Sequence, residues 1–165
     1  MSANIFVTGG AGYIGSHICK CLARAGYQPI TFDNLSRGNK SAVKWGPLEI
    51  GNLGDTQLIE GLLIKYQPEV IIHLAGLAYV GESVDDPKKY YENNVIGTLS
   101  LLDAMNSSGN NKIVFSSSCA VYGSSNRVPI DEQVTCCPDN PYGASKHMIE
   151  QILSDYDHAF QISSV

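Results

Sequence analysis

The chain has 165 residues, of which 44% are hydrophobic and 16% charged, a composition that fits one globular domain and excludes a disordered chain. The formal net charge is −5 and no basic cluster is present, so we expect neither nucleic acid nor an anionic membrane as a partner. No apolar run approaches the ~20 residues of a membrane span, and the N-terminus lacks a signal-peptide pattern.

The cysteines indicate a reducing compartment. Their number is odd and their spacing matches no disulfide framework, so we interpret them as reduced thiols of a cytoplasmic protein. They are Cys19, Cys21, Cys119, Cys136 and Cys137. The adjacent pair Cys136 and Cys137 has no second cluster of Cys and His near it in the sequence, so we interpret it as an incidental loop pair and expect no metal site.

A glycine-rich turn follows the first apolar run. Residues 4–7 suit a buried strand, and apolar residues recur at spacings of three and four over 14–25, which predicts a helix. Gly9, Gly12 and Gly15 therefore fall where a strand turns into a helix. Glycine permits the tight turn and lets backbone N–H groups approach a ligand, and the start of the helix suits a pyrophosphate. The same pattern also occurs in an ordinary strand–turn–helix corner.

A second strand is predicted at residues 29–32, followed by a loop that begins with Asp33. An acidic residue at this place, about 20 residues after the glycines, can accept hydrogen bonds from ribose hydroxyls and repels a 2′-phosphate. Asp33 therefore favours NAD over NADP. Arg37, four residues later, is the residue that could instead hold the phosphate, and Asp33 could also be a simple turn or helix-cap residue.

Strands and helices continue to alternate along the rest of the chain. Further strands are expected at 48–50, 70–74 and 112–116, and helices over 58–66, 91–105 and 141–153. This alternation predicts an α/β fold, a Rossmann-like doubly wound parallel sheet with helices on both faces, formed by one dinucleotide-binding domain over 1–165. His73 is alone in an apolar run and is interpreted as a packed core residue. Residues 161–165 are expected to begin another strand.

Three residues near the end of the chain could carry chemistry. Tyr142 and Lys146 are four apart on the last predicted helix and share one face. A free phenol has a pKa of about 10, but an ammonium nearby favours the phenolate, which can take a proton from a substrate hydroxyl while hydride leaves for a nicotinamide. Ser118, after the Ser-rich end of the preceding strand, can hydrogen-bond the same substrate oxygen. Alone, a Tyr-x-x-x-Lys pair is common and indicates little.

Together these motifs resemble the UDP-glucose (UDP-galactose) 4-epimerases of the extended short-chain dehydrogenase/reductase superfamily. The glycine pattern is G-x-x-G-x-x-G rather than the common G-x-G-x-x-G. Matching segments cover nearly the whole chain: 8–15, 33–35, 73–77, 80–83, 90–95, 97–98, 115–123 and 141–146. Full epimerases are about twice this length, so the resemblance implies the N-terminal half of such an enzyme, without the C-terminal domain that binds the UDP-sugar.

The resemblance also implies a cofactor, roles for residues, and partners. The cofactor is NAD, and the residues implied at its site are Gly9, Gly12, Tyr13, Ile14, Gly15, Asp33, Asn34, Ser36, Asn52, Leu53, Leu74, Ala75, Gly76, Ala78, Asn93, Tyr142 and Lys146. Tyr142 would be the acid/base, Ser118 its partner, and Lys146 the holder of the nicotinamide ribose. The family removes hydride from carbon 4 of a UDP-hexose, lets the 4-keto sugar rotate and returns the hydride to the other face. A UDP-sugar substrate and a homodimer of the full-length protein follow.

Several positions depart from the family pattern. Asn52 stands where an aspartate is usual, Ala78 where many members have a lysine, and Ala120 where a threonine is usual. Residues 78–83 also resemble epimerases of UDP-xylose or UDP-arabinose, so a UDP-xylose/arabinose or UDP-glucuronate 4-epimerase remains an alternative. Sugar-nucleotide dehydratases carry an Asp-Glu pair directly after the catalytic hydroxyl residue, and this chain lacks it. The last alternative is a truncated NAD-binding module without turnover.

Overall fold

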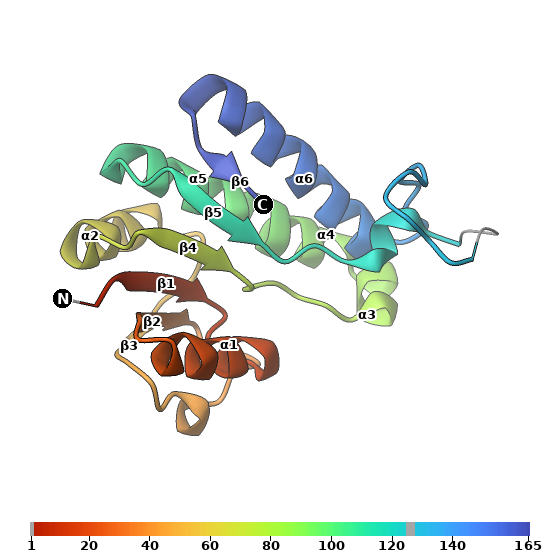
Figure 1. The fold of residues 1–165 in the computed structure, drawn as a ribbon. Helices are drawn as coiled ribbons and strands as arrows, with labels where there is room; N and C mark the ends of the chain where they lie inside the picture. Colours follow the sequence, from red (N-terminus) through yellow and green to blue (C-terminus); the bar gives the residue numbers. More distant parts are fainter. Residues whose placement is uncertain (1, 125–127) are drawn as a thin grey trace.

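The computed structural model describes residues 2–124 and 128–165 and shows a parallel sheet covered by helices (Figure 1). The sheet has six strands in the order β3-β2-β1-β4-β5-β6. The strands are β1 (Asn4–Thr8), β2 (Gln28–Asp33), β3 (Leu48–Ile50), β4 (Val70–His73), β5 (Lys112–Phe115) and β6 (Ser163–Ser164). From β1 the chain adds β2 and β3 on one side of the sheet. It then crosses back over β1 and adds β4, β5 and β6 on the other side. This reversal between β1 and β4 is the switch point where doubly wound sheets bind ligands.

Most of the core lies on one face of the sheet, under three long helices. Phe6, Ile30 and Ile113 point to this face and pack against α2 (Thr56–Tyr66), α5 (Gly97–Ser108) and α6 (Pro141–Phe160). Each of these helices contributes two or more fully or nearly fully buried side chains, such as Leu63 and Leu101. Successive strand residues alternate between faces, so the neighbours of Phe6 point to the other side.

The opposite face of the sheet carries a smaller cluster under α1 (Tyr13–Arg24). Ile5 and Val7 pack there against Cys19 of α1. Val114 of β5 points away from the main core and is 40% exposed, so α1 covers mainly the β2–β1–β4 part of this face. The prediction of helices on both faces of a doubly wound parallel sheet is confirmed, with unequal cover on the two faces (Figure 1).

The helix expected over 91–105 is longer and less regular than predicted. It starts as α4 (Pro87–Tyr90), where Asp86 caps the first turn, continues as the π-helical segment η2 (Tyr91–Ile96) and ends as α5. A π-helical turn changes the direction of side chains relative to an α-helix and is frequent at functional sites. Here it turns Asn94 into the interior, where the residue is fully buried.

Other boundaries differ by small amounts. β4 and β5 each end one residue early; after β4, the Leu74 N–H donates to the Thr8 carbonyl and hydroxyl. The short helices α3 (Val80–Asp85), η1 (Lys40–Ala42) and η3 (Cys119–Tyr122) were not expected. The strand expected within 161–165 is present as β6, paired to β5 through Lys112 and Ser163. Within the described residues, no helix is long and apolar enough to cross a membrane.

Candidate active site

A cavity of about 490 Å³ opens at the carboxyl ends of the strands, at the switch point between β1 and β4. This volume is within the range of small-molecule and cofactor sites. It is lined by the predicted residues Gly9, Gly12, Tyr13, Ile14, Gly15, Asp33, Asn34, Ser36, Asn52, Leu53, Leu74, Ala75, Gly76, Ala78 and Asn93. Tyr142 and Lys146 do not line it. Leu77, Tyr79 and Ser116 line it without having been predicted.

The glycine turn allows two segments of backbone to pack in direct contact. Gly9 has φ +71°, and a Cβ there would lie 2.7 Å from the Ala75 nitrogen. A Cβ on Gly15 would lie 2.7 Å from Gly10 Cα and against the Gly9 carbonyl oxygen. Main-chain atoms cannot move aside as a flexible side chain can. The glycines at these two positions are therefore required by the close approach of β1, α1 and the segment after β4.

The start of α1 presents unpaired backbone donors to the cavity. Gly12 is the N-cap residue and has no side chain to accept from the first turn. Tyr13 and Ile14 begin the helix and line the cavity, with 83% and 59% of their surfaces exposed. Their N–H groups have no partner within the helix, and the helix dipole adds partial positive charge. This arrangement fits a pyrophosphate.

Asp33 is held in place by the backbone of two neighbouring loops. Its Oδ2 accepts from the Ala11 N–H at 3.0 Å and its Oδ1 from the Leu35 N–H at 2.8 Å, and the residue is 8% exposed. A carboxylate can accept about four hydrogen bonds, so lone pairs remain for ribose hydroxyls. Beside it, the Asn34 side-chain amide donates to Asn52 Oδ1 at 2.9 Å. These groups fit the ribose and base of a dinucleotide without providing a cation for a 2′-phosphate.

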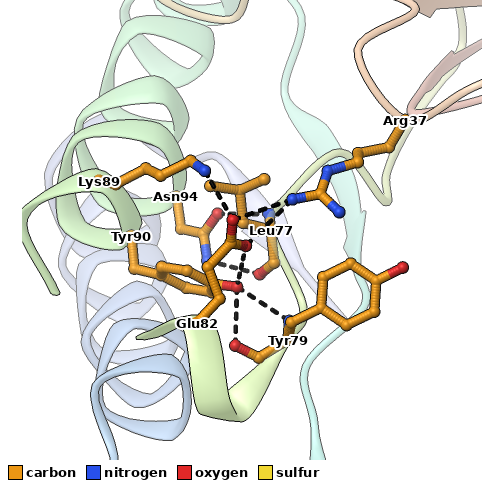
Figure 2. A network of polar contacts seen from close by, with 7 residues as sticks. All are labelled: Arg37, Leu77, Tyr79, Glu82, Lys89, Tyr90 and Asn94. Atoms are coloured by element: carbon orange, nitrogen blue, oxygen red, sulfur yellow. Dashed lines mark hydrogen bonds and ion pairs between the residues drawn. The ribbon is translucent and has the colours of Figure 1, made fainter. Parts of the chain in front are cut away.

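Arg37 belongs to a polar network at the rim of the cavity (Figure 2). Its Nη2 lies 3.0 and 3.1 Å from the two carboxylate oxygens of Glu82, and its guanidinium lies 4.8 Å from the centre of the Tyr79 ring. Glu82 also accepts from Lys89 and from the Tyr90 hydroxyl. These donors hold the pKa of Glu82 below its usual value, with Lys89 and Tyr90 as the main causes. Glu82 is thus a charged partner for Arg37.

Lys146 is buried beside the inner end of the cavity. Its Nζ donates to the Ser116 carbonyl at 2.9 Å and lies 4.6 Å from the centre of the Phe115 ring. Burial lowers the pKa of Lys146 to about 8, and the charge of Glu150 opposes that shift. The ammonium is close to Gly76, whose Cβ, if present, would lie 3.6 Å from it. The lysine therefore reaches the cavity wall from behind rather than lining it.

Tyr142 lies one turn before Lys146, in the first turn of α6. Asn140 caps this helix by accepting the Gly143 N–H, and Pro141 occupies its first position. The Tyr142 N–H donates to Ser83 Oγ at 3.1 Å, and its ring meets the Tyr90 ring edge-on at 6.4 Å. Among the described residues its hydroxyl has no hydrogen-bond partner, so it is available to a ligand.

Ser118 follows β5 and caps η3. Its Oγ accepts the Ala120 N–H at 3.2 Å, and the residue is half-buried. One residue earlier, Ser117 Oγ donates to Glu150 of α6, which ties this segment to the helix that carries Tyr142 and Lys146. The three predicted catalytic residues are therefore held by two elements that are bonded to each other. Their catalytic roles stay predictions.

Two buried polar residues that the sequence reasoning missed hold the site together. Asn94 accepts from the Leu77 N–H at 2.8 Å and donates to the Leu77 carbonyl (Figure 2). It also donates to Ser145 Oγ, so it joins the segment after β4 to α6. Ser83 receives the Tyr142 N–H. Asn94 could have been noticed, because it falls on the apolar stripe of the predicted helix, between Tyr91 and Thr98.

His73 is a packed core histidine, as predicted. Thr98 Oγ1 donates to the Asn94 carbonyl, so it must accept from His73 Nε2 at 2.9 Å. Thr8 Oγ1 accepts the Leu74 and Ala75 N–H groups and donates to His73 Nδ1 at 2.7 Å. The ring is therefore neutral with its proton on Nε2. Burial, assisted by the charge of Lys146, lowers the pKa of His73 to about 3.

The fold and the cavity define a class, the doubly wound dinucleotide-binding domains. The model of the NAD dependent epimerase/dehydratase family matches residues 5–165, and the chain belongs to this family.

Relatives and solved structures agree with this assignment. The chain is 51% identical over 161 residues to UDP-glucose 4-epimerase of Rhizobium leguminosarum bv. trifolii, which covers 98% of this chain and 49% of that protein. It is 40% identical over 163 residues to a probable UDP-arabinose 4-epimerase of Oryza sativa subsp. japonica, covering 93% and 40%. The crystal structure of UDP-glucose 4-epimerase from Brucella ovis in complex with NAD superposes with a TM-score of 0.97 and 48% identity, covering 99% of this chain and 50% of that one. The chain thus spans about half the length of the proteins it matches.

Proposed function

We propose that this chain is the NAD-binding and proton-transferring half of a UDP-sugar 4-epimerase, with UDP-glucose and UDP-galactose as the substrate pair. The observation that carries the proposal is that Tyr142 and Lys146 share one face of α6, and that the Lys146 ammonium donates to the carbonyl of Ser116, a residue that lines the glycine-turn cavity. The residues around that cavity supply what NAD requires: backbone donors for the pyrophosphate and Asp33 for the ribose.

In this proposal NAD, when bound, accepts a hydride from carbon 4 of the sugar and later returns it. The residues of the chain handle the proton. The Tyr142 phenolate oxygen takes it from the sugar 4-hydroxyl as the 4-keto sugar forms, and the resulting phenol gives it back after the sugar has rotated. The ammonium of Lys146 favours a phenolate nearby and binds the nicotinamide ribose, while Ser118 hydrogen-bonds the sugar oxygen and orients it.

NAD is preferred over NADP in this proposal because Arg37 is engaged elsewhere. Its guanidinium is paired with Glu82 and stacked on Tyr79, whereas Asp33 faces the ribose position with its negative charge. A 2′-phosphate at that place would be repelled by the Asp33 carboxylate, and the Arg37 guanidinium that could offset this repulsion is already paired with Glu82.

The UDP-sugar site, the second domain and the homodimer belong to the proposal as well. Residues 1–165 form the cofactor domain, and a C-terminal domain holds the UDP moiety. UDP-arabinose or UDP-xylose is the second candidate substrate, favoured by the resemblance of residues 78–83 and by the plant relative named above. The alternative to an enzyme is a binding module, which would hold NAD without turning over a substrate.

The test separates cofactor binding from turnover. Residues 1–165 are titrated with NAD and with NADP by calorimetry, and we expect saturable NAD binding that is tighter than NADP binding. UDP-galactose turnover by this chain alone should be negligible, because no binding energy from the UDP moiety orients the sugar. A chain extended past Val165 should turn it over. Folded protein without NAD binding would overturn the proposal, and NAD binding by an extended chain that is inactive on every UDP-sugar would favour the module without turnover.

A further inference from the structure

Folding brings together three potential metal ligands that are not adjacent in the sequence. Cys136, in the segment between η3 and α6, meets His147 and Glu150 of α6, and one ligand atom of each lies within 4.8 Å of the other two. The expectation of no metal site rested on the absence of a Cys/His cluster near Cys136 in the sequence. In space such a partner exists. None of the three residues lines the dinucleotide cavity.

The helix already holds two of the three ligands at a suitable separation. His147 and Glu150 are three apart in α6, so both project from one face. His147 Nδ1 lies 3.3 Å from Glu150 Oε2. Tetrahedral Zn²⁺ with N and O ligands at 2.0–2.2 Å has ligand–ligand separations of about 3.4 Å. The nitrogen and the oxygen are therefore in place, and the Cys136 sulfur needs to shift by no more than about 1.5 Å.

Both helical ligands also have outer contacts of the kind that orient metal ligands. Ser117 Oγ donates to Glu150 Oε1, which leaves Oε2 for a cation. The second ring nitrogen of His147, Nε2, lies 3.4 Å from the Gln151 side-chain amide. If that amide is rotated by 180°, its oxygen takes this place and can accept a hydrogen bond from Nε2–H. The ring proton must be on Nε2 when Nδ1 binds a metal.

From this geometry we propose that Cys136, His147 and Glu150 form a binding site for a thiophilic divalent cation of the Zn²⁺ type. A thiolate, an imidazole and a carboxylate are all ligands that Zn²⁺ accepts, whereas Mg²⁺ and Ca²⁺ prefer oxygen alone. All three residues are half-buried, so water can fill the fourth position. The bound cation fastens the segment before α6 to the helix that carries Tyr142 and Lys146. This inference does not depend on the proposed epimerase activity.

The test uses Co²⁺ as a spectroscopic probe on the 165-residue chain, prepared without a histidine tag and under reducing conditions. A thiolate bound to Co²⁺ produces a charge-transfer band in the near ultraviolet. We expect this band to saturate at one Co²⁺ per chain and to disappear when Zn²⁺ is added, because Zn²⁺ binds such sites more tightly. Mg²⁺ should have no effect on it.

The neighbouring cysteine supplies the matched control. Cys136→Ser should abolish the band, whereas Cys137→Ser, which changes the exposed next residue, should keep it. Glu150→Gln keeps an acceptor for Ser117 but loses the carboxylate, and His147→Gln loses the imidazole. Each should weaken Co²⁺ affinity by at least about tenfold, since even outer-contact changes cost 10–100-fold. Far-ultraviolet circular dichroism checks that all variants are folded.

Each other result would overturn the proposal. A folded wild-type chain without the band has no such site. A band that survives in Cys136→Ser, or that Cys137→Ser also removes, assigns the thiolate elsewhere. If Cys136→Ser loses the band while both helical variants keep the wild-type affinity for Co²⁺, Cys136 binds cobalt without His147 and Glu150. If Cys136→Ser does not fold, the two helical variants and Cys137→Ser still decide.

Discussion

The two ends of the cavity are built in different ways. At the dinucleotide end, the groups that face a ligand are main-chain N–H groups of the turn between β1 and α1, together with Asp33 of the next strand. At the other end, called the reaction end, the side chains proposed to act are Ser118, Tyr142 and Lys146. They do not line the cavity itself, and their positions depend on residues far along the chain. Ser83, for example, binds the Tyr142 N–H across 59 residues.

This difference determines which property a substitution at each end should change. At the dinucleotide end the ligand groups other than Asp33 are backbone, so a side chain added at the glycine turn acts there by steric conflict and should disturb folding together with binding. At the reaction end each side chain has its own proposed chemical role, so a conservative change should remove the chemistry and leave the fold intact. The predictions below test this contrast.

The largest effect is expected from Tyr142→Phe. It removes the hydroxyl proposed to exchange a proton with the sugar and keeps the ring packed against Tyr90. UDP-galactose turnover, measured in a longer chain that supplies the UDP-sugar site, should fall by about 10²–10⁴-fold with NAD still bound. Ser118→Ala should cost less, because it removes a positioning hydrogen bond only. If Tyr142→Phe retains most activity, the acid/base assignment is wrong. If it loses NAD instead, the tyrosine is a structural contact of the cofactor.

The dinucleotide end is tested by alanine at two helical glycines. In Gly15→Ala the new Cβ meets main-chain atoms of Gly9 and Gly10, so stability should fall by about 3 kcal/mol and NAD binding should be lost. Gly61→Ala in α2 is the control, since a Cβ there meets nothing within 4 Å and should raise stability by about 0.5–1 kcal/mol. Urea unfolding of both variants measures the difference. Equal stabilities would show that the turn can rearrange.

These two ends also differ in how far the sequence predicts them. The glycine turn, Asp33 and the alternation of strands and helices depend on spacings within about 20 residues, and the structure has them as expected. The face shared by Tyr142 and Lys146 follows from a four-residue spacing in the same way. The catalytic assignments themselves are not tested by the structure and stay predictions.

What the sequence did not predict depends on contacts between distant segments. Asn94 binds Leu77 and Ser145, which lie 17 and 51 residues away. It points into the core because it lies in a π-helical segment, which the spacing of apolar residues in the sequence does not predict. The six residues of α3 are too few to show a helical repeat. Cys136 meets His147 and Glu150 only because the segment before α6 folds back along that helix.

A third prediction concerns His73, which bonds Thr8 of β1 and Thr98 of α5. Its pKa of about 3 lies below the 6.5 of an unfolded chain, so the unfolded state binds more protons between these values. Stability is therefore lost as the pH falls through 6.5, by about 2 kcal/mol between pH 6.5 and pH 5. In His73→Asn this contribution to the pH dependence should vanish, while in His17→Asn, where the ring is exposed, it should remain. Urea titrations at the two pH values decide, and identical slopes for wild type and His73→Asn would contradict the prediction.

The smallest effect is expected at the rim, where Arg37 pairs with Glu82 (Figure 2). Glu82→Gln removes the charge that pairs with Arg37, so Arg37 becomes free to turn toward a 2′-phosphate. NADP should then bind more tightly, but by no more than about fivefold, because an exposed ion pair is a weak constraint and Asp33 still repels the phosphate. NAD affinity should change little.

Lys89→Met is the control: it removes another cation from Glu82 and leaves the Arg37 pair, so the ratio of NADP to NAD affinity should stay unchanged. Calorimetric titration of wild type, Glu82→Gln, Lys89→Met and Arg37→Ala with both cofactors measures these ratios. If Arg37→Ala raises NADP affinity, or if Glu82→Gln leaves it unaltered, the ion pair has no part in cofactor choice and Asp33 alone determines it.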